Sequence, residues 1–165
     1  ADGDGKGRRR QEGDGGLTVF RKEIRNEIKI GAPAEAVWKA LTDFESFRDW
    51  NPFMRPVVGT ASVGAELRVQ IRPPGGRAMA FRPKVTVAAA NRELRWLGRL
   101  FLPGLFDGEH IFEIEPLGPG RVRFVQREVF CGLLVPFLAK RIDQTLSGFE
   151  EMNRALKERV EAGEG

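Results

Sequence analysis

The chain of 165 residues is 41% hydrophobic and 30% charged, with a formal net charge of +4 at pH 7. These values are typical of one globular domain with room for a hydrophobic core, and no apolar run approaches the roughly 20 residues of a membrane-spanning helix. A single cysteine excludes an internal disulfide, so we expect a reducing, cytoplasmic compartment.

Residues 1–16 are predicted to be a disordered tail, because they contain glycine, aspartate and arginine with almost no apolar side chains. The short basic cluster at 8–10 could contact nucleic acid or act as a targeting signal, but three basic residues among acidic ones are a weak signal, and a solvated tail is the favoured interpretation. Residues 17–163 are predicted to form a single domain.

The first predicted strand, 19–30, alternates between charged residues and apolar or amide residues. Pro33 then opens a predicted short helix, 34–41, since proline suits the first turn of a helix. A second short helical segment, 44–50, ends at the turn signal Asn51-Pro52.

A run of strands follows, separated by turns rich in proline and glycine. The expected strands span 66–72, 81–89, 92–100, 108–115 and 121–131. Pro83 is expected at an edge or a bulge, because proline cannot donate to a strand ladder.

The longest element is a predicted helix over 133–161, whose apolar residues recur at steps of three, four and seven. That stripe comprises Leu134, Leu138, Ile142, Phe149, Met152, Leu156 and Val160. We interpret Gly148 as a close-packing contact, because glycine inside a helix otherwise costs about 1 kcal/mol. So long a stripe needs a broad apolar partner. We therefore predict an α+β fold in which a curved antiparallel sheet wraps around the long helix, with two short helices after the first strand and an internal hydrophobic cavity.

Three segments carry a resemblance to a known family. They read GAPAEAVWKALTDFESFRDWNPF, GLFDGEHIFEIEPLG and GFEEMNRALKERVE. They resemble START-like (SRPBCC) proteins, and most closely the bacterial group described as polyketide cyclase/dehydrase and lipid-transport-like proteins. The resemblance covers about 19–161 and implies the helix-grip fold, in agreement with the order of elements above. Because this superfamily includes carriers, cyclases, ring hydroxylase subunits and receptors, function has to be argued from the site.

Side-chain alternation predicts which residues face the cavity. In strand 108–115, three glutamates occupy one face, so His110 and Phe112 are expected to point inward. In strand 121–131, three arginines occupy one face, and the opposite face is expected to be the inner one. The inward set of that strand is Val122, Phe124, Gln126, Glu128 and Phe130.

The register of these two strands predicts one polar spot on an apolar wall. Pairing them about the turn at 118–120 places Phe112 near Phe124 and His110 near Gln126. Glu128 then lies close to His110 on the diagonal.

These predictions outline a candidate small-molecule site with apolar walls and a few convergent polar groups. The predicted lining residues are Trp50, Phe53, Trp96, Phe106, His110, Phe112, Phe124, Gln126, Phe130, Leu138 and Ile142. A second interpretation stays open for several residues. Trp50 and Phe53 also fit an ordinary core, His110 fits a structural histidine, and Glu128 fits a strand end that pairs with an arginine in solvent.

Several kinds of chemistry are not supported by the sequence. One histidine and one cysteine provide no metal ligand set, and no metal or other cofactor is expected. No glycine-rich phosphate loop follows a strand and opens a helix. The arginines of the outer strand faces lack interleaved aromatic residues, so no nucleic-acid partner is expected. The long helix lacks a basic membrane-binding face, and no stable membrane insertion is expected.

Two functions are consistent with the predicted site. The first is binding of a hydrophobic small molecule (lipid, polyketide or aromatic), with His110 and Gln126 anchoring its polar end. The alternative is a cofactor-independent polyketide cyclase, aromatase or dehydratase that uses His110 as general acid/base. Glu128 would then assist His110, since a carboxylate near an imidazole favours the charged form of the imidazole. A non-catalytic regulatory role is a third possibility.

Overall fold

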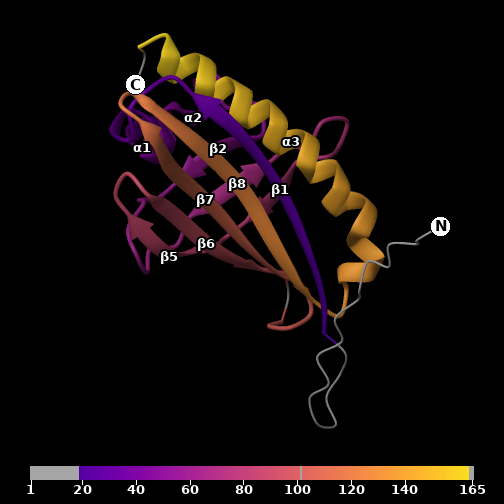
Figure 1. Cartoon of the computed structure of the whole chain (residues 1–165). Helices are drawn as coiled ribbons and strands as arrows, with labels where there is room; N and C mark the ends of the chain where they lie inside the picture. Colours follow the sequence, from indigo (N-terminus) through magenta and orange to yellow (C-terminus); the bar gives the residue numbers. More distant parts are fainter. Residues whose placement is uncertain (1–18, 101, 164–165) are drawn as a thin grey trace, which may run out of the picture.

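Two antiparallel sheets and one long helix form the described chain, residues 19–100 and 102–163 of a computed structural model (Figure 1). The predicted arrangement of a curved sheet, two short helices after the first strand and a long C-terminal helix is confirmed. The tail predicted for residues 1–16 lies outside the described residues.

The larger sheet has five strands and is antiparallel throughout. Its strands, in spatial order, are β1 (Phe20–Ile30), β8 (Arg121–Gly132), β7 (Asp107–Gly118), β6 (Glu93–Arg99) and β5 (Lys84–Ala89). In β1 the alternation predicts the faces correctly, because Ile24 and Ile30 are buried while Arg25 and Lys29 are exposed.

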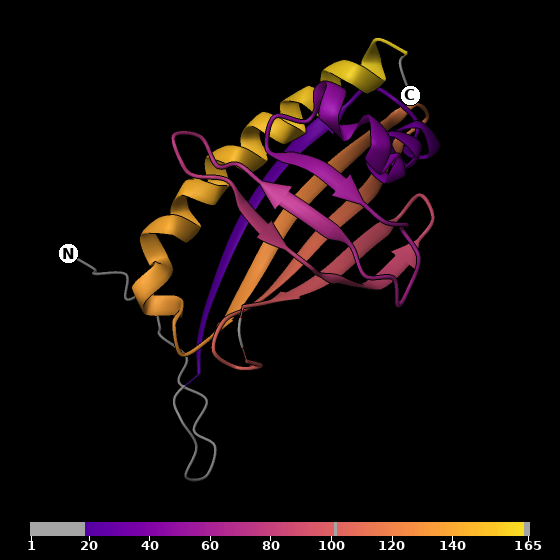
Figure 2. The ribbon, with the colours of Figure 1, turned by 180° about the vertical axis from the view of Figure 1, so that it is seen from behind.

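A smaller sheet of three strands, lying over the larger one, differs from the prediction (Figure 2). Its order is β2 (Met54–Val58), β3 (Arg68–Ile71) and β4 (Met79–Phe81). The strand β2 was not predicted, because no element was expected between the turn at Asn51-Pro52 and the strand over 66–72. The single strand predicted over 81–89 is two strands, since the chain leaves one sheet after Phe81 and enters the other at Lys84.

The two sheets share hydrogen bonds only along a short seam of the described chain. Leu67 N–H donates to Pro83 O over 2.8 Å, and Val85 N–H donates to Ala65 O over 2.9 Å. Proline fits this junction because only its carbonyl is needed there.

Three helical segments precede the small sheet, and one long helix ends the fold. They are α1 (Ala34–Thr42), a 3₁₀ turn (Phe44–Ser46), α2 (Phe47–Trp50) and α3 (Val135–Glu161). The predicted stripe of α3 is buried from Ile142 onward, at Ile142, Phe149, Met152, Leu156 and Val160. Leu138, nearer the N-terminus, is only half-buried.

Gly148 makes the close-packing contact expected of it, with Phe53 as the partner. A Cβ added at Gly148 would lie 2.3 Å from Phe53 Cδ2. The ring of Phe53 in turn packs edge-on against Phe149, with ring centroids 5.8 Å apart. Gly148 therefore lets the segment before β2 lie directly on α3.

The β7–β8 register differs from the predicted register by two residues. His110 pairs directly with Glu128, and Phe112 pairs with Gln126. A shift of two leaves every face assignment unchanged, because side chains alternate with a period of two. The change brings Glu128 directly opposite His110.

The outer face of the large sheet is covered by paired charges. Arg127 donates two hydrogen bonds to Glu113, and Arg123 donates one to Glu115. The hydrogen bond to Glu113 is the main cause that raises the pKa of Arg127 above its usual value. Ile111 and Val125 are buried on this face, which is expected where long charged side chains lie over apolar ones.

Candidate ligand-binding cavity

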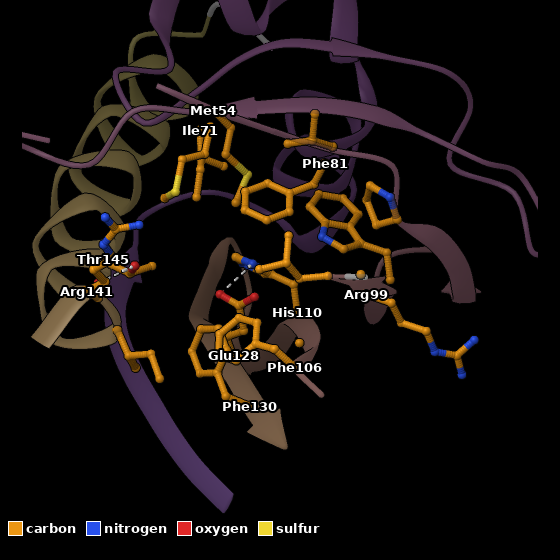
Figure 3. A pocket seen from close by; sticks show the side chains of 18 of the residues that line it. Met54, Ile71, Phe81, Arg99, Phe106, His110, Glu128, Phe130, Arg141 and Thr145 are labelled. Atoms are coloured by element: carbon orange, nitrogen blue, oxygen red, sulfur yellow. Dashed lines mark hydrogen bonds and ion pairs between the residues drawn. The ribbon is translucent and has the colours of Figure 1, made fainter. Parts of the chain in front are cut away.

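A cavity of about 300 Å³ lies between the large sheet, the small sheet and the N-terminal half of α3 (Figure 3). Its floor comes from β6, β7 and β8, its roof from β2, β3 and β4, and one side from α3. The lining residues are Phe53, Met54, Val69, Ile71, Met79, Ala80, Phe81, Pro83, Trp96, Gly98, Arg99, Leu100, Phe106, Gly108, His110, Glu128, Phe130, Leu138, Arg141, Ile142 and Thr145.

Two glycines keep the floor open where β6 pairs with β7. Gly98 and Gly108 are direct cross-strand partners, so no side chain fills the space above either backbone. A Cβ at Gly108 would lie 2.9 Å from Glu128 Oε1 and 3.5 Å from the ring of Phe130. The glycine therefore gives the Glu128 carboxylate room to turn into the cavity.

His110 lies on the cavity floor, enclosed by aromatic rings, and only 2% of it is exposed. Its ring centroid is 4.4 Å from that of Phe112, 5.0 Å from Phe149 and 5.4 Å from Trp96. The inward orientation predicted from the alternation of β7 is what the structure has. Because the surroundings are apolar, the polar partners of the imidazole determine which ring nitrogen carries the proton.

Those partners are one amide and one carboxylate. Gln126 Nε2 lies 3.0 Å from His110 Nε2, and also donates to Met152 Sδ over 3.5 Å. In this orientation the amide donates to His110 Nε2, so the ring proton is on Nδ1. His110 Nδ1 faces Glu128 Oε2 at 3.6 Å, which is an electrostatic contact longer than a hydrogen bond.

Glu128 belongs to the cavity and not to the solvent-facing arginines. Its side chain is 17% exposed, and His110 is the one ion-pair partner that it has within 4 Å among the described residues, with no arginine or lysine as close. The interpretation of Glu128 as a strand-end residue that pairs with an arginine in solvent is therefore wrong.

The cavity brings together many of the predicted site residues. Those that line it are Phe53, Trp96, Phe106, His110, Glu128, Phe130, Leu138 and Ile142. Phe106 and Phe130 stack on each other with centroids 5.4 Å apart and form the end of the cavity near the loop 102–106.

Four predicted lining residues lie elsewhere. Phe112 and Phe124 are fully buried farther along the sheet, with their rings stacked 6.1 Å apart, and form core. Trp50 packs edge-on against Phe47 and donates its indole N–H to Ser46, away from the cavity. Gln126 contacts His110 from the core side and does not line the cavity.

Sequence reasoning missed the roof and part of the helix. Val69 and Ile71 belong to the apolar set of an expected strand, but nothing local says that this strand lies across from β7 and β8. Arg141 and Thr145 follow Leu138 by three and seven residues, which is the helical spacing that could have placed them at the edge of the stripe.

Charges at the rim are separate from the floor. Arg141 is exposed on α3, and Figure 3 shows its guanidinium on the opposite side of the cavity from Glu128. Arg99 points away from the cavity toward Asp107, with 3.8 Å between Nε and Oδ1. Asp107 also accepts a hydrogen bond from Gly104 N–H, which closes the turn before β7.

The described residues contain no group of three side chains arranged to hold a metal ion. In the same ranges, every helix is too short or too polar to cross a membrane.

The sequence from 21 to 161 matches the family described as polyketide cyclase / dehydrase and lipid transport. The chain belongs to this family. The resemblance to START-like proteins read from the three sequence segments is thereby confirmed.

Several solved structures of other proteins have the same fold as this family member. A START superfamily protein from Mycobacterium smegmatis is 24% identical with a TM-score of 0.65, covering 85% of this chain and 97% of that chain. Norcoclaurine synthase from Thalictrum flavum is 15% identical with a TM-score of 0.72, covering 91% and 100%. The Zhui aromatase/cyclase from Streptomyces sp. R1128 is 15% identical with a TM-score of 0.63, covering 88% and 99%. No curated protein gives a significant match.

Proposed function

We propose that this family member binds a hydrophobic small molecule, of the lipid, polyketide or aromatic kind, in the cavity between the sheets and α3. The observation that carries the proposal is a cavity of about 300 Å³ with mostly apolar walls and one polar pair, His110 and Glu128, on its floor. Apolar walls with a few convergent polar groups are the usual character of small-molecule sites. The family description, which includes lipid transport, supports the same class of ligand.

Burial of apolar surface would supply the affinity. A ligand that buries about 200 Å² of apolar surface gains about 5 kcal/mol at about 25 cal/mol per Å², from which the costs of ordering and association are subtracted. We therefore expect moderate affinity, set by how well the ligand matches the walls.

A cavity-filling variant tests the proposal. A Cβ at Gly98 would meet nothing closer than 3.8 Å, so Gly98→Val places methyl groups in the cavity without a backbone clash. The wild-type protein should bind the neutral fluorophore prodan with a blue-shifted emission, and Gly98→Val should weaken binding at least about tenfold. Ala89→Val, in β5 and outside the cavity, is the control and should bind as the wild type does. Equal binding by Gly98→Val would overturn the proposal.

Native mass spectrometry of the freshly purified protein complements this test. A co-purifying hydrophobic molecule of defined mass would identify the chemical class of the natural ligand. The same adduct should be missing from Gly98→Val purified in parallel.

A second function, cofactor-independent cyclase, aromatase or dehydratase chemistry, is favoured by one observation. His110 Nδ1 faces the Glu128 carboxylate at 3.6 Å, while Gln126 holds the other ring nitrogen at 3.0 Å. A histidine that is oriented on one side and paired with a carboxylate on the other can act as a general acid/base toward a substrate in the cavity. The similar aromatase/cyclase structures share the fold and are compatible with this role.

The two functions differ in what His110→Ala does. The molecule extracted from the protein is incubated with wild type and variant, and products are followed by mass spectrometry. An enzyme loses turnover in the variant while it keeps most of its affinity, whereas a carrier shows no product with either protein and a modest loss of binding.

A further inference from the structure

We propose that the cavity selects ligands whose polar end is a protonated amine, seated against Glu128. This inference rests on the proposed function, since it names the ligand class of the same cavity. It is argued from the charges, contacts and rings around the Glu128 carboxylate.

Glu128 is the one carboxylate that lines the cavity in the described part of the chain. The neighbouring acidic residues of the sheet point outward and pair with arginines, as Glu113 does with Arg127 and Glu115 with Arg123. Glu128 has no lysine or arginine partner among the described residues, and only His110 faces it. The sheet therefore places one anionic group without a permanent cation on an apolar floor.

The two oxygens of Glu128 have different surroundings. Oε2 faces His110 Nδ1 at 3.6 Å, whereas Oε1 lies over Gly108, where the missing side chain leaves space. Because Gln126 donates to the far side of the imidazole, His110 offers one proton to Glu128 and no permanent positive charge in this tautomer. Oε1 is thus free to accept a hydrogen bond from a ligand.

A ligand that fills the cavity removes water from this carboxylate. Burying a carboxylate is costly unless a charge or several hydrogen bonds compensate it. A ligand ammonium group provides both the charge and the donors, an alcohol provides a single neutral donor, and a ligand carboxylate adds repulsion. The electrostatics therefore rank the three polar ends in that order.

Aromatic rings next to Glu128 add to the preference for a cation. Figure 3 shows the Glu128 carboxylate just above the stacked rings of Phe106 and Phe130 and below His110. Trp96 lines the same floor beside His110. A cation close to aromatic faces gains further attraction when it is shielded from water.

The arginines of the rim do not cancel this effect at the floor. Arg141 is exposed and lies across the cavity from Glu128, and Arg99 is directed toward Asp107. Exposed charges are screened by water and salt, so they influence the floor weakly.

The test compares three probes with similar aromatic bodies, 2-phenylethylamine, 2-phenylethanol and 3-phenylpropanoate, as competitors of prodan. We expect the wild-type protein to bind the amine about tenfold more tightly than the alcohol, because both donate a hydrogen bond to the carboxylate but only the ammonium group adds an opposite charge. The carboxylate should bind most weakly. Glu128→Gln should bring the amine to within about threefold of the alcohol, because it removes the ion pair and leaves a neutral acceptor for both probes.

Glu109→Gln is the matched control, because it removes the same charge one residue from His110 on the outer face of β7. It should keep the amine preference. Glu128→Asp, which keeps the charge and withdraws it by one methylene, should retain part of the preference and serves if Glu128→Gln folds poorly.

The outcomes separate the inference from the proposed function. If prodan does not bind, or binds equally to Gly98→Val, the proposed function fails. If prodan binds in the cavity but the alcohol or the carboxylate competes as well as the amine, the amine inference alone is overturned. Retention of the full amine preference in Glu128→Gln also overturns it.

Discussion

Replacement of Gly148 by alanine tests how closely α3 packs against Phe53, the residue that precedes β2 of the small sheet. The new Cβ would lie 2.3 Å from Phe53 Cδ2, 2.5 Å from Cε2 and 2.9 Å from Cγ. The Phe53 ring is 1% exposed and is held by Phe149, so it cannot retreat without displacing other core side chains. Overpacking of this kind costs about 1–3 kcal/mol, while alanine gains about 1 kcal/mol over glycine in helix propensity.

A clash this close places the cost near the upper limit, and we expect Gly148→Ala to lower the free energy of unfolding by about 1–2 kcal/mol. Because Phe53 also lines the cavity, prodan affinity should fall in the same variant. Urea denaturation followed by circular dichroism measures the first effect, and fluorescence titration measures the second.

Two controls make this prediction sharp. Ser147→Ala, one residue earlier on the exposed side of α3, should change stability by less than about 0.5 kcal/mol. Adding Phe53→Leu to Gly148→Ala should cost less than the sum of the two single changes, since the smaller side chain relieves the clash. A Gly148→Ala protein as stable as the wild type would refute the reasoning.

Two further predictions concern the cavity floor and the end of α3. Gly108→Ala places a Cβ 2.9 Å from the flexible carboxylate of Glu128, so the free energy of unfolding should change by less than about 1 kcal/mol. The preference for 2-phenylethylamine over 2-phenylethanol should be largely lost, because the carboxylate is displaced. Retention of the preference in competition titrations would contradict this geometry. Hydrogen bonds from Lys157 and from the backbone N–H of Gly31 lower the pKa of Glu161 below its ordinary value of 4.5. The ionised Glu161 carboxylate therefore stabilises the folded protein above pH 4.5, and this contribution is lost as the pH falls through the lowered pKa. The urea midpoints of wild type and Glu161→Gln should accordingly differ at pH 7 and converge below pH 4.5. A difference that grows in acid would show that Glu161 acts in some other way.

Periodicity was sufficient for the parts of the fold whose burial is decided locally. Three glutamates on one side of β7 and three arginines on one side of β8 could only face water, which put His110, Gln126 and Glu128 inward. The long stripe of α3 likewise required an apolar surface to cover. The shift of two residues in the β7–β8 register leaves these assignments unchanged, because it keeps each side chain on the same face of the sheet.

What periodicity could not supply was the relation between distant segments. β2 is five residues long and includes Pro56, so its pattern is short and interrupted, and only its pairing with β3 makes it a strand. The separation of β4 from β5 depends on the chain leaving one sheet for another at Pro83. The roof of the cavity follows from those two events, which explains why Ile71, Met79 and Phe81 were absent from the predicted lining.

The position of the cavity at the junction of two sheets bears on how readily its specificity can change. Roof side chains such as Ile71, Met79 and Phe81 belong to a small sheet which, among the described residues, shares backbone hydrogen bonds with the large one only at the short seam near Pro83. Exchanging them for larger or smaller residues alters the room available to a ligand without touching the pairing of β1, β8, β7 and β6. Under the proposed function, substitutions in the roof would let one scaffold accept ligands of different length, while Glu128 on the floor would keep the proposed preference for a protonated amine.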